Sequence, residues 1–188
     1  MATATNGSMT TEELLSLPSD GNEKWLVRGE LKERPMTVRN WMHSRVLSRL
    51  VQALTNWNDT LPLPRGCVVS GEAGFRLRRN PDTTVGVDVA YIDAATAAKL
   101  SPKIRLVEGV PVLAVEVLSG SDTHEDVFDK IQIYLDAGTT LVWIVDPDLR
   151  TVTAIEANKP PVLFTRDQTL TAEPHLPGFA VPMSRLWE

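Results

Sequence analysis

The chain has 188 residues, of which 43% are apolar and 23% charged, and its 24 acidic and 19 basic side chains give a formal net charge of −5. This length suits one domain with a real core and is too short for two, and the composition excludes a chain that is disordered throughout. The acidic balance excludes tight, nonspecific binding of nucleic acid through overall charge, because that affinity comes mainly from Lys and Arg contacts to phosphate. We expect one domain over residues 9–188, behind a disordered N-terminus of residues 1–8, which are small and polar.

Cysteine content and hydropathy predict a cytoplasmic location. The single cysteine, Cys67, cannot form an internal disulfide, which is typical of a reducing compartment. No stretch approaches the roughly 20 apolar residues of a membrane span. The N-terminal segment also lacks the basic and apolar regions of a secretory signal. We therefore expect no contact with a membrane.

The N-terminal part is predicted to form a short helix and a hairpin. Thr10 and Glu13 form a capping box for a helix that ends near Pro18. The segment WLVRGELKERP is then typical of two strands joined by a tight turn at Arg28–Gly29.

A longer helix is predicted over Val38–Trp57, where apolar residues recur at helical spacing. Its other side carries four polar side chains, for which a solvated face is the preferred interpretation and contact with phosphate or substrate the alternative. The apolar stripe comprises Trp41, Val46, Leu47, Leu50, Val51 and Leu54, and the polar side comprises His43, Arg45, Arg49 and Gln52.

Strands are predicted between the prolines that follow this helix and the centre of the chain. CVVSGEAGFRLRR suits one or two strands with a turn or bulge at Ser70–Gly71. VGVDVAYID is a short apolar strand interrupted by Asp88, and Asp93 is placed to cap the helix AATAAKL that follows.

The centre of the chain, Val110–Gly138, is predicted to form a buried strand, a turn and a helix that ends at Gly138. VLAVEVL does not alternate with polar residues, as in strands covered on both faces, yet it carries Glu116. A buried charge of this kind needs a compensating partner. Beyond the helix, LVWIVDP indicates a second buried strand, Thr151–Glu156 and Pro161–Thr165 indicate further strands, and the proline-rich C-terminal stretch is expected to wrap the core.

Two carboxylates, Asp88 and Glu116, interrupt strands that are predicted to be buried, and a lysine can reach one of them. The strand from Glu116 to the turn spans about 10 Å, and the following helix reaches Lys130 after about 12 Å. A helix that runs back over the sheet therefore returns Lys130 to the level of Glu116. Tyr134 lies one turn further along the same helical face.

Two carboxylates and a lysine suit metal-assisted hydrolysis of a phosphodiester. Mg²⁺ takes oxygen ligands, and one or two carboxylates can hold it together with a substrate phosphate. The metal polarises the phosphoryl group and activates the attacking water, while the lysine can orient that water and neutralise developing charge. We therefore predict that Asp88 and Glu116 bind Mg²⁺, for which Mn²⁺ can substitute, and that Lys130 is the third catalytic residue.

Each of these residues also has a purely structural interpretation. Asp126 and Lys130 form an i,i+4 pair worth about 0.3 kcal/mol on a solvated helix, which alone could account for the lysine. Asp88 could cap a turn, and Glu116 could lie on an edge strand. Other chemistries have less support, because the three histidines lack zinc-ligand spacing, Cys67 lacks a nucleophile signature, and the sequence contains no P-loop or GxGxxG motif.

Three segments of the chain carry a family resemblance: GEAGFRL, GVDVAYID and VPVLAVEVLSGSDTHEDVFDKIQIYLDAGTTLVWIVDPDLRTV. Together they resemble the Uma2 family (DUF820) of the PD-(D/E)XK nuclease superfamily. The opening MTTEELLSLP, the RGEL turn, the His43-Ser44 pair before an apolar helix and the closing LPGFAVPMSRLW also fit, so the similarity covers nearly the whole chain from about Met9. The central segment is specific, whereas the flanking pieces would be weak alone.

This resemblance implies an α/β fold of the α+β kind, with a restriction-endonuclease-like mixed central β-sheet flanked by helices, and a Mg²⁺-dependent site that cuts DNA. Asp88 would be the aspartate of the first motif and Glu116 the acid of the second. The usual lysine two positions after that acid is replaced by Leu118, and in this family it resembles one displaced onto the next helix, which matches Lys130. A second departure is Val87, where the family usually has proline.

Three further residues are auxiliary candidates for the site. Glu30 and Glu72 match acidic positions near the family's strands, and Tyr134 shares the helical face of Lys130. The implied activity is that of a Mg²⁺-dependent endodeoxyribonuclease, and a homodimer is expected by analogy with the superfamily. Two alternatives stay open: a catalytically weak or inactive nuclease-fold protein that binds DNA or another protein, and an enzyme that acts on RNA.

Overall fold

The structure is a computed structural model, and it describes residues 8–188 with the exception of 37, 39 and 121. The expected disorder of residues 1–8 concerns a segment that lies, apart from Ser8, outside the described residues. The elements in chain order are α1 (Thr11–Ser16), β1 (Asn22–Val27), β2 (Glu30–Pro35), α2 (Trp41–Asp59), β3 (Cys67–Arg78), β4 (Thr83–Ile92), α3 (Ala94–Ala97), β5 (Val107–Glu108), β6 (Leu113–Val117), α4 (His124–Ala137), β7 (Leu141–Asp146), β8 (Thr151–Ile155), β9 (Val162–Phe164), β10 (Thr169–Thr171), β11 (Ala180–Pro182) and the 3₁₀ helix η1 (Met183–Leu186).

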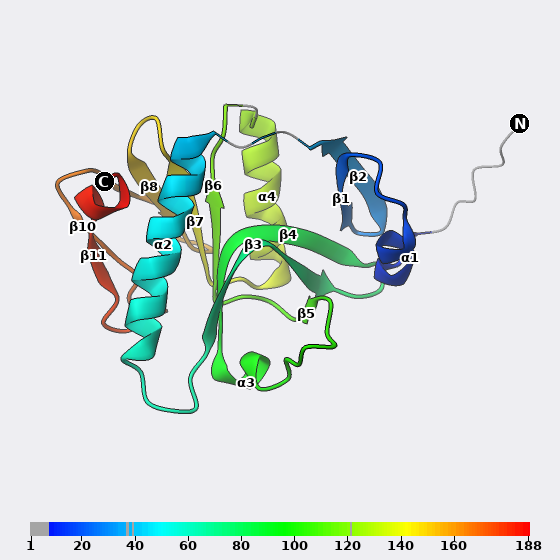
Figure 1. The fold of residues 1–188 in the computed structure, drawn as a ribbon, viewed down its shortest axis with the longest axis horizontal. Coiled ribbons are helices and arrows are strands. Elements are labelled where there is room, and N and C mark those ends of the chain that lie inside the picture. The colour runs from blue at the N-terminus through cyan, green and yellow to red at the C-terminus, as the bar shows by residue number, and fades with distance from the viewer. Residues whose placement is uncertain (1–7, 37, 39, 121) are drawn as a thin grey trace, which may run out of the picture.

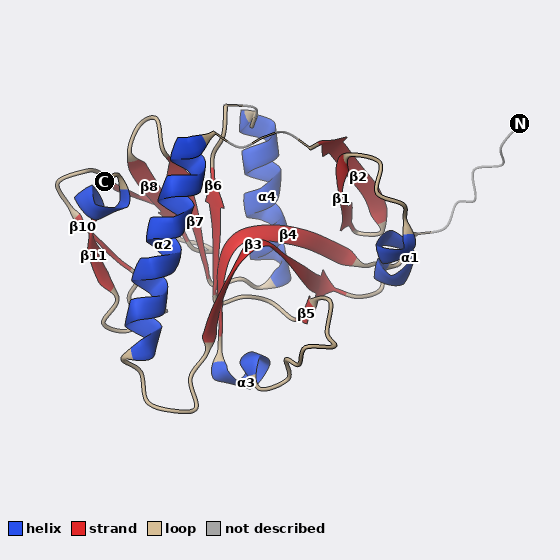
Figure 2. Ribbon diagram, viewed as in Figure 1, coloured by secondary structure: helices blue, strands red, loops and turns tan. Residues whose placement is uncertain are grey.

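A mixed sheet of nine strands forms the centre of the molecule (Figure 1). Its main path is β2-β1-β4-β6-β7-β8-β9, while β3 pairs with β4 and with β5. The long helices α2 and α4 lie against the central strands, as Figure 2 shows by secondary structure. Residues of α2 share one hydrophobic core with β6 and β7, and residues of α4 share a second core with β3 and β4. The expected mixed sheet flanked by helices is therefore confirmed.

The local signals of the N-terminal part are confirmed. Thr10 and Glu13 form both bonds of a capping box, and α1 ends before Pro18. The strands β1 and β2 pair in antiparallel register up to Val27 and Glu30. The two turn residues, Arg28 and Gly29, have φ angles of 51° and 78°, the left-handed values that a tight hairpin turn requires.

Helix α2 begins at Trp41 rather than at residue 38, because the side chain of Asn40 caps it by accepting a hydrogen bond from the amide of His43. Within the predicted apolar stripe, Val46 and Leu50 are fully buried, but Trp41 is 72% exposed. The predicted polar side is wrong for His43, which is only 3% exposed.

Strand β3 carries the predicted bulge. Its pairing with β4 shifts between Ser70 and Ala73, and the extra residues Gly71 and Glu72 have φ angles of 81° and 57°. β4 is longer than predicted, and it also contacts β1 through Leu26 and β6 through three residues. This strand therefore joins the hairpin side of the sheet to its centre, and Asp93 caps α3 after it as predicted.

The segment β6–α4–β7 forms a crossover between two parallel strands. All five residues of β6 are buried as predicted, with Leu113, Val115 and Val117 in one core and Ala114 in the other. Thr123 caps α4 through a capping box with Asp126, and Gly138 ends the helix as predicted, with a φ of 104°. Because α4 runs back along β6, its side chains come to lie beside the middle of that strand.

The C-terminal stretch covers one face of the sheet as expected. β8 and β9 extend the sheet, and β10 and β11 form a separate two-stranded sheet. Leu170, Leu176 and Phe179 pack in the same core as α2. Among the described residues, none of the helices is both long enough and apolar enough to cross a membrane.

Candidate active site

Glu116 is the buried carboxylate at the centre of the sheet, and both of its oxygens accept hydrogen bonds. Its Oε2 lies 2.5 Å from Lys130 Nζ and its Oε1 lies 2.5 Å from the Tyr134 hydroxyl. The residue is 4% exposed, on a strand flanked by β4 and β7. The length estimate for Lys130 is therefore confirmed, and placement of Glu116 on an edge strand is wrong.

The alternative partner for Lys130 was Asp126, one turn earlier on α4. The Asp126 carboxylate instead accepts hydrogen bonds from the backbone amide and hydroxyl of Thr123 at the helix start. The ammonium of Lys130 points into the protein, where its side chain is 28% exposed. Lys130 therefore pairs with the buried Glu116 and not with Asp126 on the solvated face of the helix.

Asp88 lies on the neighbouring strand β4 and is 4% exposed. Its Oδ2 accepts a 2.8 Å hydrogen bond from the Val117 amide and lies 3.7 Å from Nε2 of His43. Asp88 does not cap a turn, because it lies within a ten-residue strand. The two predicted metal ligands are therefore brought to one region of adjacent strands.

His43 is the residue of this region that the sequence analysis placed wrongly. It lies in the first turn of α2, and its buried Nε2 atom has no hydrogen-bond partner among the described residues. A signal was available, because His43 precedes Val46 by three residues and Leu50 by seven, which puts all three on one face of a helix. Position, rather than residue type, shows that this histidine faces inward.

Of the two auxiliary glutamates, only Glu72 is near the cluster. It sits in the β3 bulge, and a Cβ at Gly86 would lie 2.7 Å from Glu72 Oε2, so glycine at that position allows the close approach. Glu30 is different, since its side chain is 70% exposed and pairs with Lys32 on the hairpin. Glu30 lines a separate hollow between the hairpin and α4.

The charges of the cluster shift one another's protonation. Burial raises the pKa of Glu116, and the adjacent Lys130 offsets only part of this effect. Burial also acts to raise the pKa of Asp88, but His43, the Val117 amide and Lys130 outweigh it and hold the pKa below its usual value. For Lys130, burial acts to lower the pKa, but Glu116 outweighs it and raises the pKa.

The same carboxylates contribute to raised pKa values at Glu72 and Tyr134. Desolvation by surrounding protein atoms, followed by the charge of Asp88, raises the pKa of Glu72 to about 7. Burial and the neighbouring Glu116 raise the pKa of Tyr134 well above its usual value, so the phenol remains a hydrogen-bond donor. The charges of Asp88 and Glu116 therefore act on both Glu72 and Tyr134.

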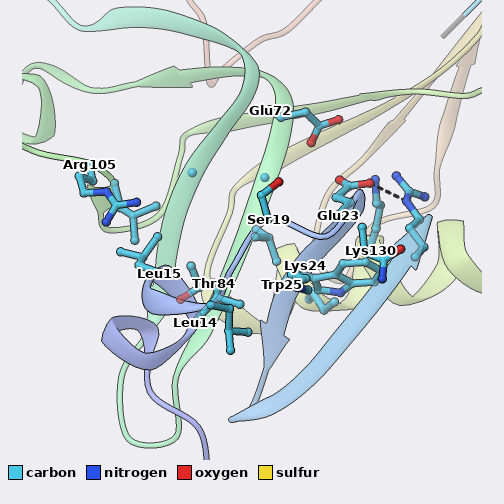
Figure 3. A pocket seen from close by; sticks show the side chains of 18 of the residues that line it. Leu14, Leu15, Ser19, Glu23, Lys24, Trp25, Glu72, Thr84, Arg105 and Lys130 are labelled. Carbon is cyan, nitrogen blue, oxygen red and sulfur yellow. Dashed lines mark hydrogen bonds and ion pairs between the residues drawn. The ribbon is translucent and has the colours of Figure 1, made fainter. Parts of the chain in front are cut away.

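Two hollows border this cluster. A small cavity of about 10 Å³ is lined by Asp88, Glu116 and Lys130 and by neighbouring residues that include Arg34 and Asp122. A larger pocket of about 390 Å³, shown in Figure 3, lies between α1, β1 and β3 and reaches Lys130 and Tyr134. The cluster is thus open to a ligand on one side and has a small polar hollow on the other.

The donor set is compatible with a hard divalent cation. A hollow of about 10 to 15 Å³ is the size of one water molecule, and the small cavity between the two carboxylates has a volume of about 10 Å³. Mg²⁺ needs only one or two carboxylates when water and phosphate supply the rest. Over residues 8–188, with the three undescribed positions left aside, no group of three or more His, Cys, Asp and Glu side chains is arranged to hold a metal.

Comparison with known proteins gives one family and one described structural neighbour. The family model Uma2, described as "Putative restriction endonuclease", matches residues 11–184. A "putative nuclease belonging to DUF820" from Anabaena variabilis has a similar crystal structure, with a TM-score of 0.77 and 19% sequence identity over 95% of this chain and 97% of that chain. At this identity the likeness concerns the fold. No curated protein matches the chain.

Proposed function

Because the chain belongs to the Uma2 family, we propose that it is a metal-dependent endonuclease that hydrolyses phosphodiester bonds of DNA. The observation that carries this proposal is the convergence of Lys130 on a buried Glu116 beside Asp88. Buried charges are costly to keep in a fold, and perturbed carboxylates in a cleft are typical of catalytic sites.

Asp88 and Glu116 are the residues that would hold Mg²⁺ or Mn²⁺. When bound, such an ion polarises the phosphoryl group and lowers the pKa of the attacking water. Lys130 orients a water at the carboxylates and neutralises charge that develops on the phosphate. Tyr134, which donates to Glu116 Oε1, holds that carboxylate in one orientation.

Cleavage of supercoiled plasmid in Mg²⁺ or Mn²⁺ tests the proposal. Glu116→Gln and Asp88→Asn keep the side-chain shapes, and each should reduce the cleavage rate by at least about 100-fold. Glu125→Gln, an exposed change on the same helix as Lys130, is the matched control and should cut normally. Cleavage that survives in the folded Asp88→Asn/Glu116→Gln double variant would overturn the proposal.

A second candidate is a nuclease fold that binds DNA or protein without cutting it. The observation in its favour is that both oxygens of Glu116 are already engaged by Lys130 and Tyr134, which compete with a cation. A ligand that binds only the folded state at 100 times its Kd stabilises that state by about 2.7 kcal/mol. For the metal-dependent nuclease proposed first, we therefore expect Mn²⁺ to raise the Tm and Glu116→Gln to abolish this rise. Absence of both the rise and any cleavage of DNA or RNA would favour this second candidate.

A further inference from the structure

The 390 Å³ pocket beside the cluster has a lining that suits one kind of ligand (Figure 3). It shares Lys130 and Tyr134 with the candidate active site, so an occupant would lie next to the two residues that donate hydrogen bonds to Glu116. Its volume is that of a small-molecule site, which ranges over about 300 to 1,000 Å³. The pocket therefore accepts a group the size of one nucleotide rather than a stretch of double helix.

The walls combine apolar surface with planar groups. Leu14, Leu15 and Leu17 of the α1 region form one side. Trp25 and Arg34 from the hairpin also line the pocket, and the guanidinium carbon of Arg34 lies 5.8 Å from the centre of the Trp25 ring. Aromatic rings and guanidinium planes are the two surfaces on which proteins stack unpaired bases.

The charge of the lining suits an attached phosphate. Within the described part of the chain, Arg105 lines this pocket, is exposed, and has no ion pair. Two other cations of the wall are already matched, because Lys24 pairs with Asp20 and Arg34 pairs with Glu23. Lys130 is likewise paired with Glu116, so Arg105 is the cation of this wall placed to contact the sugar-phosphate of a nucleotide whose base enters the pocket.

The hollow between the hairpin and α4, which has a volume of about 520 Å³, is a useful contrast. Its wall carries charges of both signs, among them Arg28, Glu30, Asp129 and Asp136. It shares Trp25 and Arg34 with the pocket beside the cluster, but not the leucines of the α1 region or Arg105. Size alone therefore does not single out the pocket beside the cluster. The leucines of the α1 region and the exposed Arg105, which line this pocket and not the other hollow, distinguish it.

From this lining we infer that the pocket binds one unpaired nucleobase of the strand held at the active site, so that the protein selects single-stranded or locally unpaired nucleic acid over intact duplex. The inference rests on the proposed function for the position of the strand. It goes further by naming the structural class of the substrate. Extrusion of a base from an intact duplex costs a few kcal/mol, roughly, whereas an unpaired base enters without this cost.

Binding without cleavage provides the test. Fluorescence anisotropy in EDTA should give a Kd at least about tenfold lower for a single-stranded 12-mer, or for a duplex with one bulged base, than for the matched intact duplex. An abasic site moved along the single strand should weaken binding about tenfold at one position only. Equal affinity for bulged and intact duplex, or an abasic scan without a sensitive position, would overturn the inference.

Variants assign the effect to this pocket. Trp25→Leu keeps apolar packing but removes the ring, and Arg105→Gln removes the free cation, so each should weaken single-strand binding about tenfold and duplex binding by less than about twofold. Lys103→Gln changes a neighbouring exposed cation that does not line the pocket, and it should leave both affinities unchanged. If Trp25→Leu fails to fold, the abasic scan of the unaltered protein still tests whether one unpaired base is bound.

Failure of this inference and failure of the proposed function give different results. If the protein cuts DNA in Mg²⁺ but does not distinguish unpaired from paired bases, the proposed function is supported and the role of the pocket is overturned. If it never cuts, yet binds unpaired bases with one abasic-sensitive position, the role of the pocket is supported and the proposed function is overturned. Tight binding of Trp25→Leu and Arg105→Gln to single strands would assign the bases to another surface.

Discussion

At Glu116 the protein keeps a carboxylate in a buried strand by giving it a fixed ammonium and a fixed phenol. The ion pair with Lys130 is an internal one, so removal of the lysine leaves a buried charge without its counterion. The stability of the fold and the chemistry of the site therefore depend on the same contact.

Lys130→Met should lower the free energy of unfolding by about 3 kcal/mol at pH 8, as for other broken buried pairs. The loss of the lysine raises the already elevated pKa of Glu116 further, and protonation then relieves the buried charge. The deficit should therefore shrink as the pH falls from 8 to 5. Urea denaturation measures it. The Glu116→Gln/Lys130→Met double variant should be more stable than Lys130→Met alone, and the opposite order would contradict this account.

Glu72 gives a pH dependence of its own. Its pKa is raised from 4.5 to about 7 in the folded protein, so between these values the folded state binds more protons than the unfolded state. Stability must then fall as the pH rises through this window and remain lower above it. Glu72→Gln should remove this fall and stabilise the protein at pH 8 by about 1 kcal/mol, allowing for the solvent exposure of the side chain.

Thermal melts across pH 5 to 8 test the Glu72 prediction. The gain in Tm of Glu72→Gln over the unaltered protein should grow with pH. Glu30→Gln is the matched control, because Glu30 is exposed and pairs with Lys32 on the hairpin. A variant at Glu72 that is equally stabilised at pH 5 and pH 8 would show that the carboxylates do not repel one another.

At the scale of the element, helix α4 is the part that carries Lys130 and Tyr134 to the strand. Its capping box at Thr123 fixes where the first turn begins. Thr123→Ala should cost about 1 kcal/mol of stability and should also reduce cleavage, because fraying at this end loosens the helix that holds Lys130. Asp93→Ala removes the cap of the short helix α3 and should leave cleavage unchanged.

The elements also show what a sequence can and cannot predict. Features that depend on signals within about 20 residues of sequence were predicted, and all are present. They are the helix caps, the Arg28–Gly29 turn, the bulge before Ala73 and the return of Lys130 to Glu116. β5 was not among the predicted strands, because its parallel pairing with β3 depends on residues far away in the chain. His43 was misplaced because polarity was weighed above helical position.

The same limit separates the two auxiliary glutamates. A bulge changes which face of a strand a residue occupies, so no period-two argument could place Glu72 beside Asp88 or leave Glu30 on the exposed hairpin. That distinction depends on how β3, β4 and the hairpin pack together. The site was therefore predictable within the β6–α4 unit and less so where separate segments meet.

At the scale of the whole molecule, the net charge of −5 limits how DNA can be bound. Among the described residues, the cations that line the pocket beside the site are Lys24, Arg34, Arg105 and Lys130. Neutralisation of at most four phosphates predicts a slope of log K against log salt no steeper than roughly −4. Anisotropy titrations in EDTA over a range of NaCl concentrations measure this slope. A slope steeper than about −6 would indicate a much larger basic surface.

The crossover from β6 through α4 has a consequence for how related sequences are recognised. The lysine and the tyrosine that contact Glu116 follow it by 14 and 18 residues, on consecutive turns of one helix. A pattern search built on an acid and a lysine two positions apart finds Glu30 and Lys32 on the hairpin and misses Glu116. A profile that fixes the spacing from the helix cap at Thr123 to Lys130 is better suited, because one residue inserted within the helix before Lys130 would rotate both side chains by about 100° away from the acid.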